Sequence, residues 1–190
     1  MASVWSLGFA VNIEVPATIK VVVNGEFPPF VGAKDLILHI IGTLTAQGAN
    51  YKVLEFHGET IRRMSTSGRI AVCNMSVEAG ATSGIVHGDD ETVRYLREES
   101  GVTEAIPCVA PDADAHYVRT VEVAVSTLEP QIACPHMVDN VKPVSAVAGT
   151  KVQQIVIGSC TNGRLDDLAV AAAILRGRKV ATGTRMLVFP

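Results

Sequence analysis

Hydrophobic and polar positions along the chain change period several times, and each change marks a predicted strand or helix. The run from Pro16 to Phe27 is rich in β-branched residues, and the run from Tyr51 to Phe56 has the same strand character. Between them, Lys34 to Gln47 carries apolar residues at helical spacing, with Gly48 just beyond. This spacing predicts an amphipathic helix that ends at the glycine.

A second group of patterns follows. Thr60 to Ala81 is helical but interrupted, and it is rich in small and sulfur-bearing residues. A further helix is predicted to begin at the acidic segment Asp89 to Glu91 and to end at Gly101, because acidic residues suit a helix N-terminus. Its apolar residues Val93 and Leu96 are expected to face inward. Short strands are predicted at Ser83 to Val86 and at Arg119 to Val125.

The C-terminal part of the chain begins with Glu129 to Thr150, which has few periodic apolar positions and which we interpret as a linker. Beyond it the pattern predicts a strand, an Ala-rich helix and a second strand. These elements are expected at Val152 to Ile157, Asp166 to Leu175 and Met186 to Phe189. Acidic residues open the helix and Arg176 closes it, which suits the helix dipole.

Together these patterns favour a mixed α/β protein. We expect an α/β domain at residues 16–128, the linker at 129–150 and the start of a second α/β domain at 151–190. Residues 1–15 are expected to form a separate N-terminal segment. Because a second domain with only two strands has an unpaired edge and an uncovered sheet face, we also expect either self-association or disorder beyond about Thr150 in the isolated chain.

Composition narrows the classes of function. Of the 190 residues, 48% are hydrophobic but only 5% aromatic, so the core is expected to be aliphatic, as in parallel strands covered by helices. The formal net charge of −3 gives no reason to expect nucleic acid or a membrane surface as partner. We expect no signal peptide and no transmembrane helix. Four cysteines without a Cys-x-x-Cys motif favour a cytoplasmic protein with reduced thiols.

One motif that can carry chemistry is the segment from Gly158 to Arg164 (GSCTNGR), which joins a buried strand to a helix. Ligands bind at the carboxyl ends of strands in open α/β sheets, so we predict a loop that presents Cys160 at a site. The helix start offers free N–H donors, and the pKa of the thiol is expected to be lowered, as a nucleophile or a metal ligand requires. The alternative interpretation is a buried, inert cysteine in a turn.

The second motif is Cys73 to Ala81 (CNMSVEAGA). Asn74 and Glu78 are four positions apart, so on one helix their side chains would project from the same face. An amide and a carboxylate placed in this way could bind a hydroxy acid and move a proton. The alternative is a polar pair on a solvated face, and the pattern by itself does not decide between the two.

Both motifs, in this order and with this separation, resemble the aconitase family of iron–sulfur hydro-lyases. The likeness extends from about Pro16 to Pro190, whereas the N-terminal segment of residues 1–15 matches the family poorly. The form of the first motif, with Gly163-Arg164, is most similar to the branch that acts on isopropylmalate and homoaconitate. Further matching segments are Gly32 to Leu38, Glu55 to Glu59, Asp90 to Leu96 and Ser126 to Pro130. The resemblance implies a three-layer α/β/α domain followed by the start of a second α/β domain.

By the same resemblance, Cys160 matches the first of three cysteines that hold a [4Fe–4S] cluster. Glu78 matches the catalytic glutamate of the family, and Asn74 and Asn162 are expected to bind substrate. An open iron of the cluster would act as a Lewis acid on the substrate, while a carboxylate manages the proton of the water. The implied reaction is the reversible dehydration and rehydration of a small dicarboxylic hydroxy acid.

The resemblance also implies a partner. The family's swivelling domain, which is a separate small subunit in the isopropylmalate branch, has no counterpart in this sequence, and neither does the Cys-x-x-Cys motif that supplies the other cluster ligands. Since one thiolate cannot hold a four-iron cluster, we expect this chain alone to carry no cluster and to be inactive. Homoaconitate and 2,3-dimethylmalate are alternative substrates. A non-enzymatic function is a further alternative, in which the chain is an inactive scaffold or an interaction module.

Overall fold

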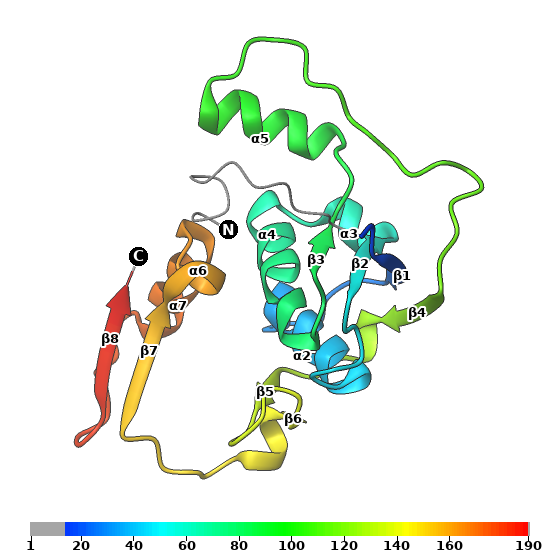
Figure 1. Ribbon diagram of the computed structural model, residues 1–190. Helices are drawn as coiled ribbons and strands as arrows, with labels where there is room; N and C mark the ends of the chain where they lie inside the picture. Colours follow the sequence, from blue (N-terminus) through cyan, green and yellow to red (C-terminus); the bar gives the residue numbers. More distant parts are fainter. Residues whose placement is uncertain (1–13, 190) are drawn as a thin grey trace, which may run out of the picture.

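The computed structural model describes residues 14–189, so residues 1–13 of the predicted N-terminal segment lie outside the described part (Figure 1). A parallel four-stranded sheet has the order β3-β2-β1-β4. These strands are β1 (Ala17–Asn24), β2 (Lys52–His57), β3 (Ser83–Ile85) and β4 (Arg119–Ala124). In this register Val21 lies opposite Phe56 on one side and Val121 on the other, so the buried positions of adjacent strands share a face.

Two helices pack on that face and close the core. Helix α2 (Ala33–Leu44) and helix α4 (Thr66–Met75) contribute apolar residues to the same buried cluster as the strands. Ile37, Ile41 and Phe56 in this cluster are completely buried, and the core is aliphatic apart from Phe56. The predicted mixed α/β class, with a parallel sheet flanked by helices, is therefore confirmed.

Helix α2 ends earlier than predicted. It stops at Leu44, and Thr45 follows with a φ of 69°, so Gly48 is not the residue that ends the helix. Gly48 instead lies against the helix end, where a Cβ atom would be only 1.8 Å from the carbonyl oxygen of Leu44. The glycine is needed for this close approach of the returning chain, which a sequence pattern does not distinguish from a helix stop.

The interrupted helical segment forms three short elements. Helix α3 (Glu59–Arg63) precedes α4, and the 3₁₀ turn η1 (Ser76–Ala79) follows α4 directly. Ser65 caps α4, since its hydroxyl oxygen accepts a hydrogen bond from the backbone N–H of Gly68 at 3.3 Å. The interruption predicted from the sequence is confirmed.

Helix α5 (Asp90–Ser100) begins and ends as predicted, with Asp89 as its cap and Gly101 in the left-handed conformation behind it. However, none of its residues is fully buried, and Val93 and Leu96 are only half-buried. The prediction that they face a core is wrong, because α5 lies apart from the sheet and contacts mainly the start of α4 (Figure 1).

The segment interpreted as a linker holds regular structure. After the 3₁₀ turn η2 (Val125–Thr127), strands β5 (Gln131–Ala133) and β6 (Val141–Pro143) form an antiparallel hairpin, followed by the turn η3 (Val144–Val147). The hairpin is attached to α2. Asp35 accepts a hydrogen bond from the N–H of Gln131 at 2.7 Å, and Asp139 accepts one from the N–H of Ala46 at 2.8 Å.

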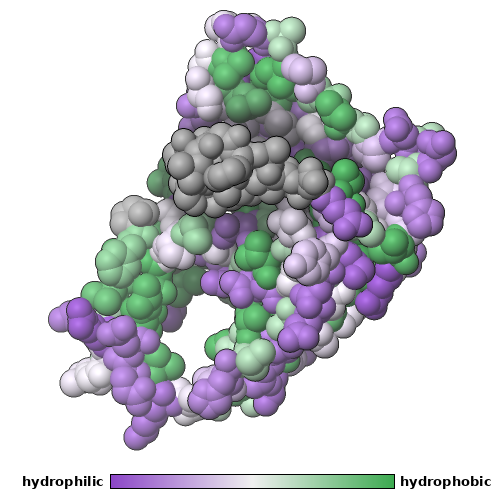
Figure 2. All heavy atoms as spheres, viewed as in Figure 1, coloured by the Kyte–Doolittle hydropathy of each residue, from purple (hydrophilic) through white to green (hydrophobic). Residues whose placement is uncertain are grey.

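The C-terminal unit has the predicted order of strand, helix and strand. It consists of β7 (Gln154–Gly158), the one-turn helix α6 (Ser159–Asn162), helix α7 (Leu165–Leu175) and β8 (Arg185–Phe189), with β7 and β8 parallel. None of the described residues of this unit is fully buried, and hydrophobic side chains are visible on its surface (Figure 2). Among residues 14–189, no helix has both the length and the apolar character needed to cross a membrane.

Candidate functional site

Cys160 lies directly behind the carboxyl end of β7. The predicted loop from Gly158 to Arg164 is instead mostly the short helix α6, which contains the cysteine. The chain turns at Gly158, where φ is 132° and a Cβ atom would be 1.8 Å from the carbonyl oxygen of Phe189 in the adjacent strand. Only glycine permits this turn beside β8, so the glycine determines where Cys160 is placed.

The structure brings Asn74 and Cys160 together, although they are 86 positions apart. The Nδ2 group of Asn74 donates to the Sγ atom of Cys160 at 3.5 Å and to the Oγ1 atom of Thr161 at 3.0 Å. These contacts join α4 of the first unit, which is built on the four-stranded sheet, to α6 of the second, C-terminal unit. The two motifs recognised in the sequence therefore meet at one place.

The environment of Cys160 favours its thiolate. The hydrogen bond from Asn74 is the largest cause, followed by that from Thr161, and together they lower the pKa of the exposed Cys160 thiol. The predicted direction is confirmed, with the amide of Asn74 as the main cause. Cys73, next to Asn74 in the chain, is the opposite case, because burial raises the pKa of its thiol to about 11.

Glu78 lies in η1 and is exposed. The predicted geometry, with Asn74 and Glu78 one turn apart on a single α-helix, is wrong. Helix α4 ends at Met75, and the tighter winding of η1 rotates Glu78 relative to Asn74. No hydrogen bond or ion pair of Glu78 is found among residues 14–189, so its carboxylate is free to meet a ligand.

Asn162 is held in place by Asp167, which sequence reasoning missed. Its Nδ2 group donates to the Oδ1 atom of Asp167 at 2.7 Å, and the other oxygen of Asp167 accepts from the backbone N–H of Arg164 at 3.2 Å. The Oδ1 atom of Asn162 is buried and has no hydrogen-bond partner among residues 14–189, and the residue lines a cavity of about 840 Å³ between the two units. An acidic residue three positions after the residue that caps a helix is a recognisable capping signal. The role of Asp167 could therefore have been predicted from the sequence.

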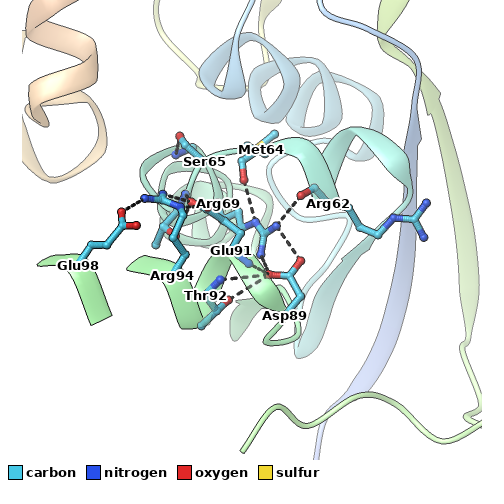
Figure 3. A network of polar contacts seen from close by, with 11 residues as sticks. Arg62, Met64, Ser65, Arg69, Asp89, Glu91, Thr92, Arg94 and Glu98 are labelled. Carbon is cyan, nitrogen blue, oxygen red and sulfur yellow. Dashed lines mark hydrogen bonds and ion pairs between the residues drawn. The ribbon is translucent and has the colours of Figure 1, made fainter. Parts of the chain in front are cut away.

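A buried arginine anchors the start of α4 (Figure 3). The guanidinium of Arg69 donates to both carboxylate oxygens of Asp89, at 2.6 and 2.8 Å, and to the backbone carbonyl oxygens of Arg62 and Met64. Its side chain is only 5% exposed. Because Arg69 is the largest cause that lowers the pKa of Asp89, this ion pair is kept charged over most of the pH range. No local pattern marks the pair, whose members belong to different helices.

The described residues supply a single exposed thiol at this site. No group of three or more His, Cys, Asp or Glu side chains in the described part of the chain is placed to hold a metal ion. The thiols of Cys73, Cys108, Cys134 and Cys160 are all free. These residues therefore offer one thiolate ligand and do not by themselves fit a four-iron cluster.

Comparison with known proteins gives a consistent result. A family model described as the aconitase family (aconitate hydratase) matches residues 3–150 and 140–190. The chain is 49% identical over 190 residues to a probable 3-isopropylmalate dehydratase large subunit of Methanothermobacter thermautotrophicus, covering 100% of this chain and 45% of that protein.

Two further relatives indicate the breadth of the match. A 3-isopropylmalate dehydratase large subunit of Elusimicrobium minutum is 47% identical over 178 residues, which cover 94% of this chain and 42% of that protein. A probable methanogen homoaconitase large subunit of Methanosarcina mazei is 45% identical over 184 residues, which cover 97% of this chain and 46% of that protein. The chain thus spans less than half the length of the curated relatives that it matches.

Proposed function

The chain belongs to the aconitase family, and from this membership we propose that it works as part of a hydro-lyase, the large subunit of a 3-isopropylmalate dehydratase. The reaction would be a reversible dehydration and rehydration that moves a hydroxyl group between adjacent carbons of isopropylmalate, as leucine biosynthesis requires. The observation that carries the proposal is the contact of Asn74 with Cys160, because it joins the two motifs at a thiol whose pKa is lowered.

The cofactor is part of the proposal. In the complete enzyme we infer a [4Fe–4S] cluster with Cys160 as one of its thiolate ligands. When bound, such a cluster supplies a Lewis-acidic iron that polarises a substrate hydroxyl. Cys160 fits this role because its thiol is exposed and favours the ionised form that a metal ligand needs. The other ligands would have to come from outside residues 14–189.

Three side chains of this chain have separate tasks in the proposed site. Asn74 donates to the Cys160 sulfur and so holds the thiolate in position. The exposed carboxylate of Glu78 would take or return the proton during dehydration and rehydration. The buried Oδ1 atom of Asn162 has no partner in the part of the chain that the structure describes, and a substrate hydroxyl donating to it would satisfy that oxygen.

The partner and the location belong to the same proposal. We infer a small subunit that completes the site, because the relatives are named large subunits. The reduced thiols agree with a cytoplasmic enzyme. Homoaconitate is the second candidate substrate, since one similar protein is named a homoaconitase large subunit.

The test uses the complete two-subunit enzyme that the proposal requires. Cys160→Ser is expected to lower the cluster's visible absorbance and to abolish turnover of isopropylmalate. Glu78→Gln should keep the absorbance and the KM near their normal values while kcat falls by about a hundredfold or more, as expected when a general base is removed.

Cys108→Ser is the matched control, because Cys108 is an exposed thiol that the proposal does not use. It should leave absorbance and turnover unchanged. Equal kinetics for Glu78→Gln and the unmodified enzyme would remove Glu78 from the mechanism. Lack of isopropylmalate turnover by the unmodified, cluster-loaded enzyme would contradict the proposed function itself.

A further inference from the structure

The one-turn helix α6, which carries Cys160, is too short to keep its conformation by itself. It spans only four residues, Ser159–Asn162, and forming a first helical turn is unfavourable in isolation. It also begins at Ser159 with a φ of 72°, in the left-handed region that residues other than glycine rarely adopt. Contacts from outside α6 must therefore hold Cys160 in its place.

Asp167, in the first turn of α7, supplies such contacts. One of its carboxylate oxygens accepts a hydrogen bond from the Nδ2 group of Asn162 at 2.7 Å, and the other accepts one from the backbone N–H of Arg164 at 3.2 Å. Asn162 is the last residue of α6, and Arg164 is the residue that caps α7. A single carboxylate thus joins the end of α6 to the start of α7. Hydrogen bonds to an ionised acceptor are also shorter and stronger than those between neutral groups.

Helix α6 also contacts α4 of the first unit (Figure 1). There the amide of Asn74 donates to the Sγ atom of Cys160 at 3.5 Å and to the Oγ1 atom of Thr161 at 3.0 Å. Asn74 belongs to the first unit, whereas Asp167 belongs to the same unit as Cys160. Asp167 can therefore order α6 within its own unit, and this order fixes the place at which the sulfur meets Asn74.

We propose that Asp167 is a positioning residue of the candidate site: through its hydrogen bond to Asn162 it determines where Cys160 lies relative to Asn74. This inference rests on the proposed function for the role of Cys160 as a cluster ligand, and it deepens that function by identifying what holds the ligand. The hydrogen bonds of Asp167 end on Asn162 and Arg164, so its effect reaches the sulfur through the backbone of α6.

The first test is a double-mutant cycle in the 190-residue chain. Asn162→Ala removes the bond to Asp167 but leaves the bond that caps α7, whereas Asp167→Ala removes both. The readout is the side-chain amide resonance of Asn74, which reports its hydrogen bonds to α6. Each variant should shift this resonance toward that of a solvated asparagine. The double variant should shift it no further than Asp167→Ala does, because both changes break the same bond.

Asp166→Ala is the matched control, because Asp166 is the neighbouring acidic residue of α7 and is exposed. It removes the same charge and should leave the Asn74 resonance unchanged. A role confined to capping α7 predicts a different pattern, in which Asp167→Ala lowers the melting temperature while Asn162→Ala leaves the Asn74 resonance as it was. That pattern would overturn the inference.

The second test uses the same variants in the complete two-subunit enzyme. Its readout is the rate at which the visible absorbance of the cluster decays after an iron chelator is added. Asn162→Ala and Asp167→Ala should each make this decay about tenfold faster, as is typical when a group that orients a metal ligand is lost. Asp166→Ala should decay like the unmodified enzyme. An unchanged rate in both Asn162→Ala and Asp167→Ala would overturn the inference even if the Asn74 resonance shifts.

Failure of the proposed function is a separate outcome. An unmodified complete enzyme that binds no cluster and does not turn over isopropylmalate would overturn that function. An unmodified enzyme that holds the cluster and turns over isopropylmalate, with the Asn74 resonance unshifted in both Asn162→Ala and Asp167→Ala, would overturn this inference alone.

Discussion

At the scale of single residues, the candidate site depends on a contact between two motifs that are far apart in the sequence. Each motif is local, so its residue types and its place beside a strand or helix could be predicted. The contact of Asn74 with Cys160 could not be derived from either motif, because it arises from the way α6 lies against α4. Its consequence is chemical, since the amide of Asn74 stabilises the thiolate more than any other neighbour does.

The first prediction concerns this hydrogen bond. In Asn74→Leu the thiolate of Cys160 loses its main donor, so the pKa of the thiol should rise toward its ordinary value. The thiolate fraction at pH 7 then falls, and alkylation of Cys160 by iodoacetamide slows. The measurement is the rate of alkylation against pH, in a Cys108→Ser background that removes the other fully exposed thiol.

Asn140→Leu serves as the control, because the amide of Asn140 donates to the carbonyl oxygen of Pro135 and not to Cys160. It should give the pH profile of the unmodified chain. If Asn74→Leu also leaves the profile unchanged, the amide does not set the acidity of Cys160.

Some of the residues that support the site can be predicted from the sequence, and others cannot. Asp167 follows a capping pattern and could have been found. Arg69 could not, because a cationic side chain in a helix is usually expected to face water. Its burial becomes favourable only when Asp89 and two backbone carbonyl oxygens surround it, and these partners come from other elements.

At the scale of elements, helix α5 depends on polar contacts. Asp89 caps α5 and binds Arg69 of α4, while Glu91 of α5 accepts hydrogen bonds from the N–H and the hydroxyl of Thr66 at 2.9 and 3.1 Å. These contacts hold α5 over the start of α4. They replace the apolar packing that the pattern of Val93 and Leu96 predicted.

The next prediction tests this attachment. Asp89→Asn leaves the buried guanidinium of Arg69 without its ion-pair partner, so the free energy of unfolding should fall by about 3 kcal/mol. Urea denaturation followed by circular dichroism at neutral pH measures the loss. Asp90→Asn is a suitable control, because Asp90 is exposed and makes no contact with Arg69.

The same contacts predict a dependence on acid. Arg94 is the largest cause that lowers the pKa of Glu91 to about 2, and Arg69 lowers the pKa of Asp89. A carboxylate whose pKa is lower in the folded state than in the unfolded state stabilises the fold fully at any pH above its unfolded-state pKa. This stabilisation is lost as the pH falls from the unfolded-state pKa through the folded-state pKa. Stability should therefore decline between about pH 4.5 and about pH 2. In the double variant Asp89→Asn/Glu91→Gln, the free energy of unfolding should fall much less over this pH range. If it falls as steeply as in the unmodified chain, other carboxylates cause the acid dependence.

Element boundaries show why local patterns were only partly sufficient. The bounds of the six parallel strands, of α5 and of α7 follow local patterns and were predicted closely. The end of α2 and the hairpin at Glu129 to Thr150 were not, because both depend on contacts from outside the segment. Asp35 accepts a hydrogen bond from the N–H of Gly32 at the start of α2 and another from the N–H of Gln131, and no periodicity encodes the second bond.

At the scale of the whole molecule, the two units differ in how completely their hydrophobic side chains are buried. The first has a buried aliphatic core, whereas no described residue of the second is fully buried. In the second unit, β7 and β8 form a two-stranded sheet whose outer edges are unpaired among residues 14–189. Val156 and Phe189 in these strands are 56% and 54% exposed. Exposed apolar side chains beside open strand edges favour association with another chain.

We therefore expect the 190-residue chain to self-associate through this sheet. Val156→Lys places a charge in the middle of β7, where pairing or stacking with a second copy would bury it, so this variant should remain monomeric at higher concentrations. Sedimentation velocity over a range of concentrations measures the effect. Val144→Lys puts the same charge on an exposed valine of the first unit's hairpin region and should associate like the unmodified chain. If both variants associate equally, the copies meet through another surface, and the open sheet of the second unit is not what joins them.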